Sequence, residues 1–154
     1  MNFFDYLIQR QTIATRVVAY DWKEAIGKGG ELLINSFACT KKYIDAIIES
    51  CEKNGPYFVI GKGIAMPHTR PEMGATGTGF ALVTLAEPVA FGDTDNDPID
   101  ILVFMAAHDS TSHVEDAMCQ VADFCDSEQN LARLRSAKNV AEVVEYLKSV
   151  KDKY

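Results

Sequence analysis

The sequence has few positive charges for its length, and this lack excludes one large class of function. Its 15 Lys and Arg residues stand against 22 Asp and Glu residues, giving a formal net charge of −7 at pH 7. A surface that binds nucleic acid needs a cationic footprint to neutralise phosphates. We therefore expect no nucleic-acid partner, and a basic or electrically mixed protein partner suits this chain better.

Long apolar runs are also lacking. No run reaches the ~18 apolar residues that a membrane span requires, and the chain does not open with the regions of a secretory signal. We expect a cytoplasmic protein without direct membrane insertion. A length of 154 residues with 47% hydrophobic content predicts a single domain, residues 1–154, with enough apolar residues for a core.

Motifs for nucleotides and metals are missing as well. The sequence contains no Gly-x-x-x-x-Gly-Lys-[Ser/Thr] loop and no His-Glu-x-x-His helix. The acidic loop from Asp93 fails as a calcium-binding EF-hand, because Pro98 and Phe104 occupy the positions that need Gly and Glu. No two cysteines form a Cys-x-x-Cys pair, and we interpret them as free buried thiols. They are Cys39, Cys51, Cys119 and Cys125. We expect neither a cofactor nor a metal.

The spacing of apolar residues predicts strands that alternate with helices. Strands are predicted over residues 13–20, 57–60, 80–86 and 99–107. Helices are predicted over residues 1–10 and 127–135 and after capping residues, which are Asp21, Thr40, either Ser110 or Ser112, and Asn139. Glu87 and Pro88 are expected to end the strand 80–86. This strand and 99–107 are almost wholly apolar, which is typical of strands covered on both faces. The pattern predicts an α/β fold, a three-layer sandwich of a mixed β-sheet with helices on both faces.

The stretch 61–71 contains the strongest candidate for a functional side chain. Gly61 and Gly63 loosen the backbone, and Pro67 fixes φ directly before His68. Because Pro67 has no N–H to give to a sheet, the strand must end or lie at an edge where His68 emerges. We therefore expect His68 at a strand end, facing solvent or a cleft.

Two further histidines follow the strand 99–107. This strand leads through His108 to His113, which falls in the first turn of the next helix. Ligands collect at strand ends in open α/β sheets, and a helix N-terminus favours a phosphoryl group. A neutral imidazole can attack phosphorus without a separate base, since phosphoryl transfer needs mainly positioning and charge stabilisation. The residues alone thus permit phosphoryl transfer at His68. The ligand count also allows a zinc enzyme with His68, His108 and His113 as ligands. Asp109 is the one carboxylate that could support them, which disfavours this alternative.

Segment 62–68 reads Lys-Gly-Ile-Ala-Met-Pro-His. It resembles the signature Gly-x-x-[Ile/Leu]-Ala-[aliphatic]-Pro-His of the mannitol/fructose-type (type 2) enzyme IIA (EIIA) domains of the bacterial phosphoenolpyruvate-dependent sugar phosphotransferase system (PTS). Residues 55–57, 70–72 and 95–98 further resemble the ascorbate-specific branch of these components. The resemblance covers essentially the whole chain and implies the mannitol-type EIIA fold.

The resemblance also implies roles and partners. His68 matches the phosphoryl acceptor and His113 the second histidine beside it. The acceptor would receive its phosphate from the phosphocarrier HPr and pass it to a cysteine of enzyme IIB (EIIB). EIIB then phosphorylates the sugar, here L-ascorbate, that enters through the membrane component enzyme IIC (EIIC). A regulatory module, in which phosphorylation of His68 changes partner choice, is the alternative.

One feature departs from the family pattern. Mannitol-type relatives place an arginine near the end of the helix before the active strand, and residues 49–53 contain none. Arg70 is the candidate that takes over the holding of phosphate. Thr69 is a second candidate, through its N–H or its hydroxyl.

Overall fold

The computed structural model describes residues 2–108 and 112–154, and the side chains of Ser112 and His113 lie outside that description. The helices are α1 (Phe3–Arg10), α2 (Trp22–Asn35), α3 (Lys41–Asn54), α4 (Ser112–Cys125), α5 (Glu128–Ser136) and α6 (Val140–Val150), with 3-10 turns η1 (Pro71–Met73) and η2 (Lys151–Lys153). The strands are β1 (Ile13–Val17), β2 (Val59–Gly61), β3 (Ile64–Ala65), β4 (Gly79–Val89) and β5 (Ile99–Ala106).

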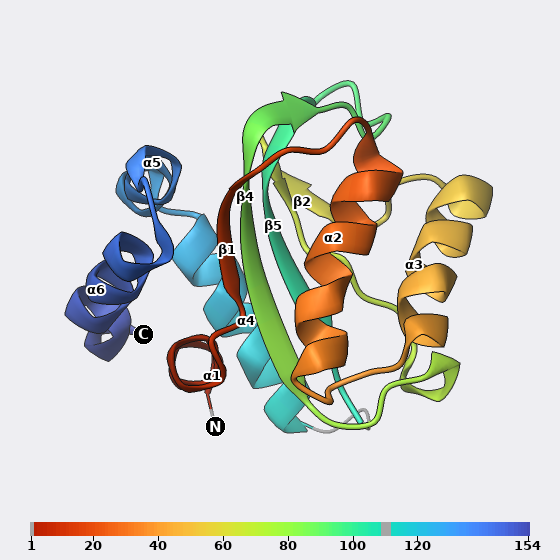
Figure 1. Cartoon of the computed structure of the whole chain (residues 1–154), viewed down its shortest axis with the longest axis horizontal. Helices are drawn as coiled ribbons and strands as arrows, with labels where there is room; N and C mark the ends of the chain where they lie inside the picture. Colours follow the sequence, from red (N-terminus) through yellow and green to blue (C-terminus); the bar gives the residue numbers. More distant parts are fainter. Residues whose placement is uncertain (1, 109–111) are drawn as a thin grey trace.

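Within the described residues, five strands form a mixed sheet in the order β1-β4-β5-β3-β2. The pairs β1/β4 and β3/β5 are parallel, whereas β4/β5 and β2/β3 are antiparallel. Helices α2 and α3 cover one face of the sheet, and α1, α4, α5 and α6 cover the other (Figure 1). The predicted mixed sheet with helices on both faces is confirmed.

Polar side chains fix the helix starts that the sequence marks. Each accepts a hydrogen bond from a backbone N–H one turn into the helix, an arrangement that contributes about 0.5–2 kcal/mol. The pairs are Asp21 with Glu24, Ser127 with Asn130 and Asn139 with Glu142. Thr40 occupies the N-cap of α3 but makes no capping bond, because its hydroxyl donates to the carbonyl oxygen of Gly74 at 3.2 Å. The Thr40 hydroxyl thus links the start of α3 to Gly74, in the loop that follows the His68 segment.

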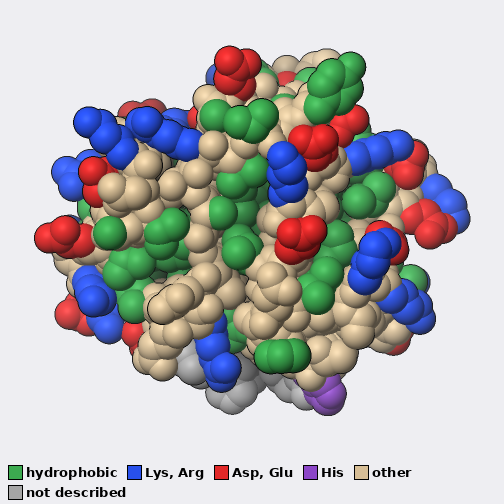
Figure 2. All heavy atoms as spheres, in the orientation of Figure 1, with side chains coloured by type: hydrophobic (Ala, Val, Ile, Leu, Met, Phe, Trp, Pro, Cys, Tyr) green, Lys and Arg blue, Asp and Glu red, His purple; other side chains and the backbone are tan. Residues whose placement is uncertain are grey.

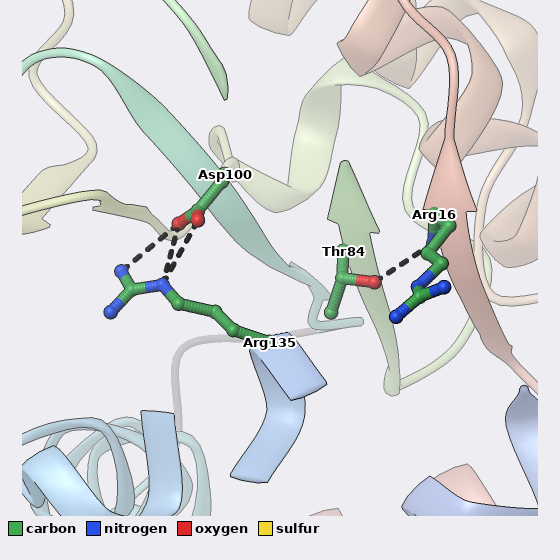
Figure 3. Close-up of polar contacts among 4 residues, drawn as sticks. All are labelled: Arg16, Thr84, Asp100 and Arg135. Carbon is green, nitrogen blue, oxygen red and sulfur yellow. Dashed lines mark hydrogen bonds and ion pairs between the residues drawn. The ribbon is translucent and has the colours of Figure 1, made fainter. Parts of the chain in front are cut away.

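Two strands end at places that the sequence did not predict. β1 ends at Val17, before residue 20, and Arg16 has a positive φ of 53°. The Arg16 N–H donates to the Thr84 hydroxyl at 3.0 Å, within the register shift between β1 and β4 (Figure 3). β4 runs through Pro88 to Val89, where we expected a break. Its pairing with β5 shifts register between Thr84 and Val89, so Pro88 needs no N–H for that ladder.

The end of the sheet where β5 begins is held by an ion pair. The Arg135 guanidinium of α5 binds both carboxylate oxygens of Asp100, with Nε at 2.9 and 3.1 Å (Figure 3). Gly63 lies next to this ion pair and has a positive φ of 76°. A Cβ added at Gly63 would be 2.6 Å from Arg135 Nη2. Glycine at this motif position is therefore favoured by its left-handed backbone conformation, whereas Arg135 Nη2 is the end of a flexible side chain that could move aside.

The surface carries charges of both signs. Lys and Arg side chains interleave with Asp and Glu side chains across the face drawn in Figure 2. Three of the four cysteines are buried, but Cys119 on α4 is exposed, so the prediction that all are buried is wrong for this residue. Among the described residues, none of the helices combines the length and apolar character that crossing a bilayer demands.

Candidate active site

His68 lies just past the short strand β3, from which Met66 and Pro67 separate it, at the end of the sheet where β5 also ends. β3 and β5 are parallel, so their carboxyl ends point the same way. Beyond β3 the chain stays beside β5, because the Met105 N–H donates to the carbonyl oxygen of Pro67 at 3.1 Å. His68 is half-buried there. The structure therefore places it at a strand end, as the Pro67-His68 pair predicts.

The His68 imidazole is held by the backbone of its own segment. Its Nδ1 lies 2.7 Å from the carbonyl oxygen of Met66. A carbonyl oxygen only accepts hydrogen bonds, so Nδ1 must carry the proton. Nε2 is then the nitrogen with the free lone pair. This contact selects one tautomer and thereby one nucleophilic atom.

A cleft of about 420 Å³ opens beside this histidine. Its walls come from helices on opposite faces of the sheet. They are Tyr43, Ser50 and Asn54 of α3, Val114 and Met118 of α4, Met105 and Ala107 at the end of β5, and Tyr57 and residues 68–71. The cleft thus combines an apolar floor with a small set of polar groups, as ligand sites commonly do.

Tyr43 joins the histidine segment to the sheet. Its hydroxyl donates to the carbonyl oxygen of Met105 at 2.8 Å and accepts the Thr69 N–H at 3.1 Å. Burial raises the pKa of Tyr43 to about 12, which extends the pH range over which the hydroxyl can donate. The Thr69 N–H already has a partner, and only the Thr69 hydroxyl is left for the phosphate role that we considered.

Tyr57 holds the other side of the segment. Its hydroxyl donates to the carbonyl oxygen of His68. Burial raises the pKa of Tyr57 as well. Tyr57 precedes β2, whereas the sequence placed it inside the strand. Our sequence reasoning assigned neither tyrosine to the site, although Tyr57 belongs to the triplet 55–57 that matches the ascorbate branch.

The other residues that the sequence predicted for the site are Arg70, His108 and His113. Arg70 lines the cleft with its side chain 77% exposed, and its Nε lies 3.5 Å from a carboxylate oxygen of Glu72. His108 is exposed, and its N–H donates to the Thr78 hydroxyl at 3.5 Å. His113 lies in the first turn of α4, but its side chain falls outside the described residues. Within the described part of the chain, no group of three or more acidic, histidine or cysteine side chains is arranged to hold a metal.

Solved structures share this fold. A crystal structure of a PTS IIA protein (PtxA) from Streptococcus mutans matches with a TM-score of 0.89 and 36% identity, covering 99% of this chain and 96% of that one. The complex of IIA-mannitol with phosphorylated IIB-mannitol from Escherichia coli matches with a TM-score of 0.76 and 26% identity, covering 90% of this chain and 95% of that one. The fold is therefore that of the mannitol-type EIIA phosphotransferases.

Sequence comparison identifies the family. The model for "Phosphoenolpyruvate-dependent sugar phosphotransferase system, EIIA 2" matches residues 6–150. The ascorbate-specific PTS system EIIA component of Escherichia coli K12 is 41% identical over 147 residues, which cover 96% of each chain. The chain belongs to the EIIA 2 family and is a phosphotransferase of the sugar phosphotransferase system, which confirms the resemblance read from the sequence.

Proposed function

We propose that this chain is the EIIA component of an ascorbate phosphotransferase system and that Nε2 of His68 is its phosphoryl acceptor. The observation that carries the proposal is the 2.7 Å contact between His68 Nδ1 and the carbonyl oxygen of Met66. It leaves Nε2 with a lone pair, on a side chain that lines the cleft.

The transfer needs no proton to move. The Nε2 lone pair attacks phosphorus of phospho-HPr, an N–P bond forms, and the bond from phosphorus to the donor breaks with its electron pair returning to the donor. The Nδ1 proton stays on the ring and remains bonded to Met66, which supports the positive charge of the phosphorylated ring. In the second step a cysteine thiolate of EIIB attacks the same phosphorus, and the N–P electron pair returns to Nε2.

Three residues support the phosphoryl group in this proposal. The Arg70 guanidinium is close enough to the cleft to exchange Glu72 for a phosphoryl oxygen. The Thr69 hydroxyl is a second donor. His113, at the start of α4, is the neighbour that the family resemblance implies, and the positive end of the helix macrodipole favours negative charge there.

Two relatives support the proposed sugar and the proposed EIIB partner. A relative that is 41% identical is named ascorbate-specific, and the mannitol relative is seen in complex with a phosphorylated EIIB. As the family resemblance implies, we propose HPr as donor, EIIB as acceptor, EIIC as the membrane component reached through EIIB, and the cytoplasm as the compartment. The sugar itself need not touch this chain.

Long-range ¹H–¹⁵N NMR of the phosphorylated, ¹⁵N-labelled protein tests the proposed atom. The expected spectrum has phosphorus on Nε2 of His68 and a proton on Nδ1. Phosphorus on Nδ1, or on a different residue, contradicts the proposal. Mixing with EIIB then separates transport from regulation, because a relay component must lose its phosphoryl group to the EIIB cysteine, whereas a purely regulatory module keeps it.

A further inference from the structure

We propose that Tyr57 is a positioning residue for phosphoryl transfer, which holds the His68 imidazole in its attacking orientation; this inference rests on the function proposed above. Two contacts from one side chain carry it. The Tyr57 hydroxyl donates to the His68 carbonyl oxygen. Its ring meets the imidazole edge to face, with centroids 5.7 Å apart and planes at 77°.

These contacts act where the sheet no longer holds the chain. Regular pairing of β3 ends at Ala65. Beyond it, the Met66 N–H donates to Phe58 at 2.8 Å, and Pro67 accepts from Met105 at 3.1 Å. The His68 carbonyl is the next group along, and the Tyr57 hydroxyl is its partner. Tyr57 therefore extends the restraint from the strand to the residue that reacts.

The local sequence fixes Tyr57 in turn. Gly55 ends α3 with a positive φ of 82°, and the Tyr57 N–H donates back to its carbonyl oxygen at 2.9 Å. Tyr57 packs against the ring of Phe58, which is fully buried. The tyrosine thus stands on a rigid turn with its ring against the imidazole, although it is 45% exposed. A half-exposed ring adds little to the core, so its hydrogen bond and its ring contact to His68 are the clearer reason for its placement.

Because these contacts already hold the His68 imidazole, it loses less conformational freedom on reaching the transition state. The Met66 contact fixes the tautomer, and Tyr57 restricts rotation of the ring and drift of the backbone beneath it. Phosphoryl transfer depends chiefly on such alignment of the nucleophile with phosphorus. Loss of Tyr57 should therefore lower the maximal transfer rate rather than the affinity for the donor.

Two substitutions separate the contacts. Tyr57→Phe removes the hydroxyl and keeps the ring, and Tyr57→Leu removes both. Tyr20→Phe is the matched control, because Tyr20 is 88% exposed. It belongs to the loop that precedes α2, and this loop lies at the opposite end of the sheet from η1, the turn that follows the His68 segment (Figure 1). Single-turnover phosphorylation by phospho-HPr, measured over a range of donor concentrations, gives the maximal rate and the half-saturating concentration.

We expect Tyr57→Phe to lower the maximal rate about 3- to 10-fold, the effect of one net hydrogen bond, with an unchanged half-saturating concentration. Tyr57→Leu lowers it further and mixes the two imidazole tautomers of His68 in the ¹⁵N spectrum, while Tyr20→Phe matches the wild type. Equal maximal rates for Tyr57→Phe and Tyr20→Phe overturn the inference. So does a higher half-saturating concentration at an unchanged maximal rate, which makes Tyr57 a docking residue. A rate loss that merely follows loss of folded protein, measured by circular dichroism, overturns it too.

His68→Ala in the same assay distinguishes the two proposals. If it accepts no phosphoryl group while the Tyr57 variants react at the wild-type rate, the relay stands and the positioning role fails. If it is still phosphorylated, the proposed function fails, and the role of Tyr57 fails with it.

Discussion

Gly29 of α2 lies directly against the ring of Phe104 on β5. A Cβ at Gly29 would overlap that ring and sit 3.1 Å from Val83, so only glycine lets the helix approach the sheet this closely. Gly27, on the same helix, has open space around it. The two positions therefore allow the same substitution to be compared with opposite expected effects.

Gly29→Ala should destabilise the protein by about 1–3 kcal/mol through overpacking. Gly27→Ala should stabilise it by about 0.5–1 kcal/mol, because alanine costs less entropy in a helix. Urea unfolding followed by circular dichroism gives both values. A Gly29→Ala protein as stable as Gly27→Ala would mean that α2 does not pack on β5 at this distance.

Tyr43 makes the stability depend on pH in the alkaline range. Its pKa is about 12 in the folded protein because of burial, against about 10 in an unfolded chain. The contribution of Tyr43 to the free energy of unfolding is complete below pH 10. Between pH 10 and 12 the unfolded chain has lost this proton and the native chain keeps it. The free energy of unfolding therefore falls as pH rises, by up to about 1.4 kcal/mol per pH unit for this one group.

Tyr43→Phe should flatten that fall over pH 10–12, and the exposed control Tyr20→Phe should keep the wild-type slope. Buried thiols contribute in the same direction, since burial also raises the pKa of Cys39 and Cys125 to about 12. The test therefore compares the free energies of unfolding of the variants and the wild type, measured by urea titration at each pH. Parallel curves for Tyr43→Phe and wild type would contradict the role of burial at Tyr43.

Arg70 is expected to assist transfer through its charge. We expect Arg70→Ala to slow phosphoryl uptake from phospho-HPr about 2- to 10-fold, less at high salt, because an exposed charge is screened. Arg10→Ala is the control, since Arg10 is an exposed arginine at the end of α1. If both variants slow the reaction equally, or neither does, Arg70 has no special part in holding phosphate.

Much of the fold follows from local chemistry that the sequence displays. The capping residues Asp21 and Asn139 mark helix starts that the structure reproduces, and the helix predicted from residue 127 is α5, with Ser127 as its N-cap. The apolar runs at 80–86 and 99–107 are the two central strands β4 and β5. Pro67 places His68 at a strand end because a residue without an N–H cannot donate to the hydrogen-bond ladder of any sheet. These features depend on neighbours in sequence.

The features that the sequence did not reveal depend on residues far apart in the chain. Thr40 bonds to Gly74 rather than to its own helix, and β4 passes Pro88 because its pairing with β5 is already shifted there. Tyr43 reads as a core residue of an amphipathic helix. Its bonds to Met105 and Thr69 require the helix to lie across the strand ends. No local pattern encodes such contacts.

The central claim is that His68 carries the phosphoryl group. Its most direct test is intact-mass analysis after incubation with phosphoenolpyruvate, enzyme I and HPr, on wild type, His68→Ala and His108→Ala. His108 is a suitable control because it is an exposed histidine just past the end of β5. We predict a single acid-labile phosphoryl adduct on wild type and on His108→Ala, and none on His68→Ala. An adduct that persists on His68→Ala, or no adduct on the wild type, would contradict the account.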